Sequence, residues 1–442
     1  MRLVALPSLR RLATVATVLC TTLLGGGLVD SVQAKNRVTP GNFTGYGFDQ
    51  CEAPSQAAMD RWLKASPYWA VGIYISGDSR GCVSQPNLDA AWVGEQLAKS
   101  WRLLPLTVGP QASCTTRERY LSQVRISPDS TRDYATARRQ GRAEAAKTVR
   151  AAERLGIARH STLWYDLEAF AIDGTKCRES ALSFLSAWTH KLHALKYESG
   201  VYSSAASGIK ILDDARVEQR GRYSMPDSVW IADWNGRADL QSSYVRPGGW
   251  MPHDRIHQYT GGHEETHGGV TIPVDSNYMS LGRGSVAPKN PRSCGVHVSF
   301  RSYSRLERGD TGMRVEGLQC LLKHKAGYAG DITGTFGRPT QRAVKKYQGT
   351  LGMPRTGLVS MSMWTALLAQ GSEPVLKYGS ARQAVRRVQR SLNAAVDARL
   401  PVTGVYDGST TAAARRYQRV VGIARTGVIG PSTWGRLMRG LR

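Results

Sequence analysis

Residues 163–168 read Leu163-Trp164-Tyr165-Asp166-Leu167-Glu168, an apolar run that ends in two carboxylates two positions apart. An apolar run of this length, rich in aromatic residues, predicts a buried strand. Side chains at positions i and i+2 lie on one face of a strand, so Asp166 and Glu168 are expected to point into one cleft. Two acids in one cleft suit glycoside hydrolysis, which needs a proton donor and a second carboxylate. An ordinary solvated strand end is the alternative.

Strand-like segments recur before and after this run, separated by helical or loop stretches. There are eight between Thr44 and Leu281: Gly45–Asp49, Ala70–Ser76, Leu103–Val108, Thr162–Glu168, Gly200–Ser203, Val229–Asp233, Ile256–Tyr259 and Val270–Asp275. Helices are predicted from Pro54-Ser55 through Lys64 and over the Ala-rich stretch Thr131–Leu155, which Gly156 ends. The pattern predicts an α/β fold, a (β/α)8 TIM-like barrel, whose functional residues lie at the carboxyl ends of strands.

The first 34 residues are typical of a secretory signal peptide. Arg2, Arg10 and Arg11 precede an apolar stretch over 12–29, and Val32-Gln33-Ala34 forms a small-residue cleavage site. The arginine pair leaves twin-arginine export open, and a retained signal anchor is a second alternative. No later segment predicts a membrane span, so the sequence predicts a secreted, extracellular protein.

Cysteine usage agrees with export. Removing Cys20 with the signal leaves six cysteines, an even number that favours disulfides over metal thiolates. Six cysteines allow 15 pairings. We choose the pairs that stay within one expected domain: Cys51 with Cys82, Cys114 with Cys177, and Cys294 with Cys320.

The formal net charge of the chain is +25. Residues 301–442 hold 24 Lys and Arg against 7 Asp and Glu, so this third of the chain carries about +17 of the excess. For an exported chain, we expect an anionic wall or membrane surface as the partner rather than nucleic acid. Codon bias toward Arg is the alternative explanation.

The C-terminal third is an internal duplication at a constant offset of 70 residues. The matched pairs include Leu306 with Leu376, Gly309 with Gly379, Gln319 with Gln389, Gly334 with Gly404, Thr340 with Thr410, Tyr347-Gln348 with Tyr417-Gln418, Gly357 with Gly427, and Trp364 with Trp434. Helical spacing of apolar residues predicts a small helical module in each copy. Both copies resemble the peptidoglycan-binding domain type 1 family, although Arg382 and Asp407 replace Gly312 and Gly337 of the first copy. The resemblance implies binding to murein, and we expect the two tryptophans to be core residues.

The strand-bearing region resembles a glycoside-hydrolase-like domain of unknown function from secreted wall proteins, itself similar to family 25 lysozymes. The motifs that carry this resemblance are residues 47–51 (GFDQC), 165–168 (YDLE), 199–204 (SGVYSS), 230–232 (WIA), 257–259 (HQY) and 274–278 (VDSNY). The resemblance implies an acidic cluster of Asp49, Asp166, Glu168 and Asp275, with Glu168 as general acid and Asp166 as its partner. Candidate substrate-binding residues are Tyr202, Trp230, Gln258 and Asp233, with core packing or a structural role as the alternative.

A further motif, His263-Glu264-Glu265-Thr266-His267, matches the zinc-protease pattern H-E-x-x-H. That chemistry needs a helix, whereas Gly261-Gly262 and Gly268-Gly269 flank these residues and predict a loop. A zinc-dependent wall peptidase is therefore the third hypothesis, and we expect neither a metal nor a cofactor.

These observations predict five segments: a signal peptide over 1–34, a barrel domain over 35–285, a linker over 286–300, and murein-binding modules over 301–371 and 372–442. The leading hypothesis is a wall-associated glycoside hydrolase that acts on peptidoglycan as a monomer. A catalytically inactive wall-binding protein is the alternative.

Overall fold

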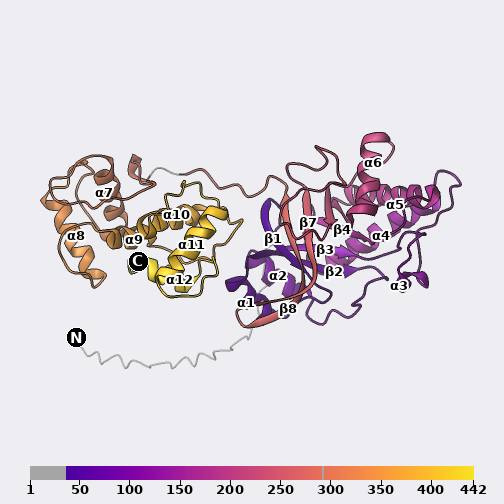
Figure 1. Cartoon of the computed structure of the whole chain (residues 1–442), viewed down its shortest axis with the longest axis horizontal. Coiled ribbons are helices and arrows are strands. Elements are labelled where there is room, and N and C mark those ends of the chain that lie inside the picture. The colour runs from indigo at the N-terminus through magenta and orange to yellow at the C-terminus, as the bar shows by residue number, and fades with distance from the viewer. Residues whose placement is uncertain (1–35, 291–292) are drawn as a thin grey trace, which may run out of the picture. The chain divides into compact units, whose positions relative to one another are not determined.

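The barrel is a closed sheet in which eight strands follow one another in chain order (Figure 1). The computed structural model describes residues 36–290 and 293–442. The expected signal segment, Cys20 and Pro291 of the expected linker lie outside the described residues. The strands are β1 (Phe43–Asp49), β2 (Tyr68–Ser76), β3 (Arg102–Thr107), β4 (Thr162–Leu167), β5 (Glu198–Ser204), β6 (Ser228–Ala232), β7 (Arg255–His267) and β8 (Val270–Leu281).

The predicted barrel is confirmed, with one reversal of direction. Strands β1 to β7 pair in parallel, whereas β8 is antiparallel to both β7 and β1. Only Gly268 and Gly269, both with positive φ, join β7 to β8. A two-residue connection permits only an antiparallel return. The predicted loop over His263–His267 is therefore wrong, because these residues continue strand β7 as one arm of a hairpin.

Helices cover the outside of the barrel between β1 and β6. They are α1 (Gln56–Ala65), α2 (Ala90–Ala98), α3 (Glu118–Leu121), α4 (Ala135–Arg154), α5 (Thr175–Ala194) and α6 (Lys210–Glu218), the last preceded by a π-helical turn over Ala205–Ile209. The Ser55 side chain caps α1 as predicted, by accepting from the backbone N–H of Ala58. Helix α4 starts later than predicted, because Arg132, Asp133 and Tyr134 have positive φ.

Each repeat is a three-helix module with its own apolar core. The first contains α7 (Met313–Ala326), α8 (Arg338–Thr350) and α9 (Met361–Ala369), and the second contains α10 (Gln383–Val396), α11 (Gly408–Val420) and α12 (Pro431–Met438). Trp364 and Trp434 are 0% exposed, and their indole N–H groups donate to the carbonyls of Ser304 and Pro374. They are therefore core residues, as expected.

Three disulfides connect the cysteines in the predicted pairs, Cys51–Cys82, Cys114–Cys177 and Cys294–Cys320. The first joins the loops that follow β1 and β2, and the second joins the loop after β3 to helix α5. Both disulfides thus tie down loops at the carboxyl ends of strands. Among the described residues, none of the helices combines the length and apolarity that a membrane span requires.

Candidate active site

The predicted acids come together at the carboxyl ends of the strands. Asp49 ends β1 and is the register partner of Asp275 on β8. Asp166 lies near the end of β4, and Glu168 directly follows that strand. Since the carboxyl ends of parallel strands meet at one end of a barrel, Asp49, Asp166 and Glu168 share that end. Asp275 joins them from the middle of the antiparallel strand β8 through its pairing with Asp49.

Asp49 is one of the two most enclosed members of the cluster, with 3% of its surface exposed. Its Oδ1 accepts from the amide of Asn277 at 2.7 Å and from the amide of Gln258 at 3.1 Å. The Gln258 amide also lies 3.4 Å from Asp275 Oδ2. Burial, followed by the charge of Asp275, raises the pKa of Asp49 to about 8 despite these hydrogen bonds. This carboxyl group therefore retains its proton through neutral pH.

Asp166 is equally buried, and its Oδ1 has no hydrogen-bond partner in the described structure. Burial, then the nearby charges of Glu168 and Asp49, raise its pKa well above the ordinary value. Burial likewise raises the pKa of Asp275, while the backbone N–H of Gly262 opposes this by donating to Asp275 Oδ1 at 2.6 Å. The cluster therefore disfavours simultaneous ionisation of its members.

Glu168 is the acid that faces a cavity of about 290 Å³. Its Oε2 lies 3.2 Å from the guanidinium of Arg117, and its side chain is 21% exposed. The cavity is lined by Arg117, Glu168, Ala169, Tyr202, Ser204, Ala205, Ala206, Ala232, Asp233, Trp234 and Tyr244. A second cavity of about 530 Å³ lies beside Asp49 and Asp275. Glu168 thus borders a cavity rich in aromatic side chains, and Asp49 and Asp275 border the other. Asp166 is among the lining residues of neither cavity.

The candidate substrate residues have different surroundings. Tyr202 and Asp233 line the cavity of Glu168, and the Tyr202 hydroxyl donates to Gln258 Oε1 at 3.0 Å. Gln258 is 0% exposed and connects Tyr202 to Asp49, so it organises the site from beneath. Trp230 is also 0% exposed, and its indole N–H donates to Asn277 Oδ1 at 2.7 Å. Because Trp230 is enclosed, it supports Asn277 instead of facing the cavity.

Gln111 is a positioning residue that the motifs do not reveal. Its amide donates to the backbone carbonyl of Asp166 at 2.9 Å, and its Oε1 accepts from the backbone N–H of Glu168 at 2.8 Å. Gln111 is 1% exposed, so both bonds are shielded from water. This one side chain therefore fixes the backbone on either side of Leu167 and sets the spacing of the two acids.

The loop from Asp233 to Asp254, between β6 and β7, brings two aromatic residues that the motifs missed. Trp234 is 65% exposed and Tyr244 is 40% exposed, and both line the cavity of Glu168. The Trp234 indole also donates to Gln258 Oε1 at 2.9 Å. Exposed aromatic faces beside a carboxyl group are suited to stacking on sugar rings.

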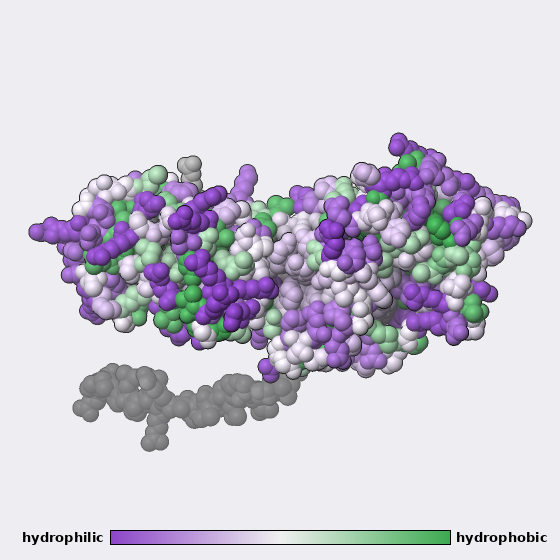
Figure 2. All heavy atoms as spheres, viewed as in Figure 1, coloured by the Kyte–Doolittle hydropathy of each residue, from purple (hydrophilic) through white to green (hydrophobic). Residues whose placement is uncertain are grey.

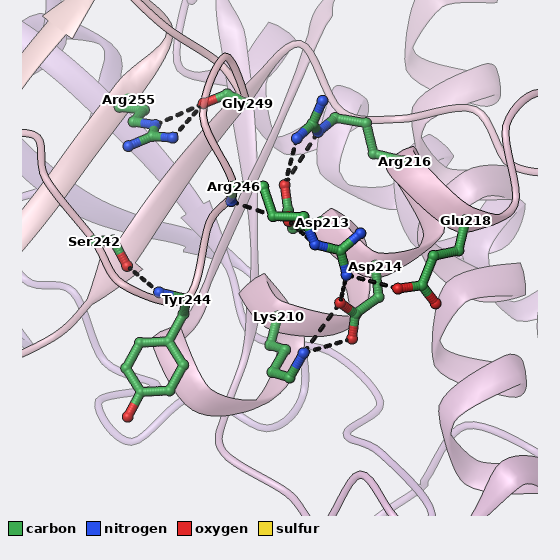
Figure 3. Close-up of polar contacts among 10 residues, drawn as sticks. All are labelled: Lys210, Asp213, Asp214, Arg216, Glu218, Ser242, Tyr244, Arg246, Gly249 and Arg255. Carbon is green, nitrogen blue, oxygen red and sulfur yellow. Dashed lines mark hydrogen bonds and ion pairs between the residues drawn. The ribbon is translucent and has the colours of Figure 1, made fainter.

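Helix α6 anchors this loop by charged contacts (Figure 3). The Arg246 guanidinium reaches Asp214 at 2.5 Å and Glu218 at 2.7 Å, while its backbone N–H donates to Asp213. Asp213 is 1% exposed and also accepts from Arg216 at 2.6 Å. The loop position is therefore set by a network centred on a buried carboxylate.

The hairpin motif forms a separate polar cluster. Both His263 Nε2 and His267 Nε2 contact Glu265, at 3.1 and 2.7 Å, and Tyr68 donates to the same carboxylate at 2.5 Å. These hydrogen bonds outweigh burial and lower the pKa of Glu265 to about 2. Since the motif lies on a strand, its histidines do not share the helical face that the zinc-protease pattern uses.

Known proteins match this chain over both of its regions. The family described as "Rv2525c-like, glycoside hydrolase-like domain" matches residues 61–279. A family of peptidoglycan binding domains matches residues 311–367 and again residues 381–437. An uncharacterized protein in the bpoA1 3'region of Kitasatospora aureofaciens is 35% identical over 100 residues, which are 22% of this chain and 83% of that protein.

Solved structures are similar over about half of the chain. The Tat-secreted protein Rv2525c of Mycobacterium tuberculosis is 14% identical, with 54% of this chain and 96% of that chain covered and a TM-score of 0.33. A family 25 glycosyl hydrolase of Bacillus anthracis is 14% identical, with 56% and 90% covered and a TM-score of 0.32. The spore cortex lytic enzyme SleM of Clostridium perfringens is 14% identical, with 53% and 67% covered and a TM-score of 0.36.

The barrel of this chain is an Rv2525c-like, glycoside hydrolase-like domain, and two peptidoglycan binding domains follow it.

Proposed function

We propose that the protein is an exported, cell-wall-associated glycoside hydrolase that cleaves the glycan of peptidoglycan and acts as a monomer. The observation that carries this proposal is the acid cluster, in which buried Asp49 and Asp166 lie beneath a more accessible Glu168. The two peptidoglycan binding domains hold the barrel close to the polymer on which such chemistry acts.

In the proposed reaction, a glycan strand lies in the cavity of Glu168 with its sugar rings against Trp234 and Tyr244. Arg117 leaves Glu168 for an anionic group of the substrate, and Glu168 delivers a proton to the glycosidic oxygen. The anomeric carbon is attacked either by Asp166 or by a substrate acetamido group that Asp166 orients. Water then breaks this new bond and gives its proton to Glu168, which restores the acid. The charges on Asp49 and Asp275, which depend on pH, set the electrostatic surroundings of Asp166 and Glu168.

Replacing Glu168 tests this assignment. Glu168→Gln keeps the shape of the side chain but removes the proton transfer, so release of reducing ends from purified murein should fall by about 100-fold or more. Glu153→Gln is the matched control, because it makes the same chemical change on helix α4, where the Glu153 side chain is 48% exposed and outside the acid cluster. Full activity in the Glu168 variant would overturn the assignment.

A catalytically silent wall-binding protein is the second candidate. The contact between Arg117 and Glu168 favours this candidate, because the guanidinium lies 3.2 Å from the carboxylate oxygen that would have to face the substrate. This candidate predicts that neither the parent nor any acid variant releases reducing ends, while sedimentation with murein is unchanged.

A further inference from the structure

The two repeats differ at one turn that the duplication otherwise preserves. The first repeat has Glu307-Arg308-Gly309 where the second has Lys377-Tyr378-Gly379. Glu307, Arg308 and Gly309 are exposed, whereas Lys377 is 1% exposed and Gly379 is buried. A lysine side chain is rarely buried without a specific partner, so we expect Lys377 to have such a partner.

Lys377 is enclosed by the barrel. Its Nζ donates to the backbone carbonyl of Leu63 at 3.0 Å and lies 4.5 and 5.0 Å from the ring centres of Trp69 and Trp101. Leu63 belongs to the last turn of α1, where carbonyls lack helical partners and the helix dipole favours a cation. The two indole faces add cation–π attraction. The Lys377 nitrogen thus meets three complementary groups of the barrel, although burial lowers the pKa of this side chain well below the ordinary lysine value.

Tyr378 covers part of the barrel wall that lacks a helix. Its hydroxyl lies 3.0 Å from that of Tyr278, and its ring centre lies 5.1 Å from that of Tyr46. Tyr46 and Tyr278 are register partners on β1 and β8. Tyr46 shares a strand face with Phe48, which packs on Trp62 of helix α1, so this face is the outer one. In the described chain, β8 is followed by an extended segment instead of a helix.

Gly379 allows the close approach. A Cβ added there would lie 2.3 Å from the carbonyl oxygen of Thr44, while a Cβ added at Gly309 would meet nothing within 4 Å. The carbonyl of Gly379 accepts from the Ser285 hydroxyl at 2.7 Å. Further along, Gln383 donates to the Lys289 carbonyl at 2.5 Å and Asn393 donates to the Phe300 carbonyl at 3.0 Å. The connecting segment is therefore held against the second repeat at several points.

We propose that the second repeat is a fixed extension of the barrel, docked by its Leu376–Ser380 turn at the amino ends of β1, β2 and β3. This docking site is opposite to the acids, which lie at the carboxyl ends of the strands. The first repeat lacks the docking residues, so the duplication has produced one copy specialised for attachment to the barrel. Murein bound by the repeats then meets a barrel of fixed orientation. The proposal is independent of whether the barrel is catalytic.

Exchanging the turns tests the docking. Lys377→Glu with Tyr378→Arg gives the second repeat the residues of the first, which folds with them. Spin labels on cysteines replacing Leu121 and Val420, both exposed, report the distance from the barrel to the second repeat. We expect a single narrow distribution of label-to-label distances in the otherwise unchanged chain. In the exchanged variant this narrow distribution should be lost. The reciprocal Glu307→Lys with Arg308→Tyr should leave it unchanged.

A glycine pair provides a second test. Gly379 and Gly309 both have positive φ, so Gly379→Ala and Gly309→Ala share the backbone strain, but only the first introduces the clash with Thr44. Only Gly379→Ala should broaden the distance, with near-ultraviolet circular dichroism confirming that both variants fold. A broad distance in the parent, or a narrow one in the exchanged and Gly379→Ala variants, would overturn the proposal.

Discussion

The acid cluster contains carboxyl groups that the barrel withdraws from water. Asp49 keeps two amide donors, from Asn277 and Gln258, yet its pKa is still raised because burial and the neighbouring Asp275 penalise its charge. Asp166 has fewer compensating contacts, and its pKa is raised for the same main reason. Such burial costs stability, which is common for residues retained for chemistry.

Because burial penalises the charged form of Asp49, we expect the stability of the protein to depend on pH. The folded chain holds the proton of Asp49 up to about pH 8, whereas the unfolded chain releases it near pH 4. The contribution of Asp49 to stability is therefore full below about pH 4 and is lost as the pH rises toward about 8. Asp49→Asn cannot ionise at this position, so the variant should not lose this stability as the pH rises. The melting temperature of the variant minus that of the parent should therefore increase from pH 4 to pH 8. Each unit of pKa shift corresponds to about 1.4 kcal/mol.

Asp78→Asn is the control for this measurement, because the Asp78 side chain is 89% exposed. Thermal unfolding of both variants and the parent across the pH range gives the comparison. If the melting temperatures of Asp49→Asn and the parent differ by the same amount at pH 4 and pH 8, the predicted role of Asp49 is wrong.

At the scale of elements, the loop between β6 and β7 shapes the cavity, and helix α6 holds that loop through Arg246 (Figure 3). Arg246→Ala should free Trp234 and Tyr244 from their positions and weaken binding of soluble glycan fragments by about 10-fold, or about 1.4 kcal/mol. Calorimetric titration measures this affinity. Arg237→Ala is the control, since Arg237 lies in the same loop, its side chain is 75% exposed, and its guanidinium pairs with Asp239 within that loop. Equal affinities in both variants would show that the tether does not shape the site.

The strands were predictable because each combines an apolar run with an acid or turn at its end, as Leu163–Glu168 does. The reversal of β8 was missed because Val270–Leu281 has the same composition that a parallel strand would have, and only the two-glycine connection indicates the hairpin. Gln111, Arg117 and Trp234 were missed because no local pattern marks them. Gln111 is 55 positions from Asp166, and such long-range contacts depend on the folded barrel.

At the scale of the whole molecule, the repeats concentrate positive charge. Hydrophilic side chains cover much of the visible surface, with smaller hydrophobic areas between them (Figure 2). Because residues 301–442 carry 24 Lys and Arg against 7 Asp and Glu, electrostatic attraction should contribute to wall binding.

Salt should therefore weaken retention on murein. Raising ionic strength from about 0.1 M to about 1 M shortens the Debye length from about 10 Å to about 3 Å. Sedimentation of Glu168→Gln with insoluble murein, in which the polymer stays intact, should show less protein in the pellet at high salt. Retention that does not depend on salt would instead indicate uncharged contacts.

The central claim is that the acid cluster cleaves glycan, and mass analysis of the fragments tests it most directly. The protein is incubated with purified murein, and the soluble products are identified by mass before and after borohydride reduction. The account predicts fragments that end in a newly formed reducing sugar, which disappear when Glu168→Gln replaces the parent. Products cut only within the stem peptides, or no products beyond those of murein alone, would contradict it.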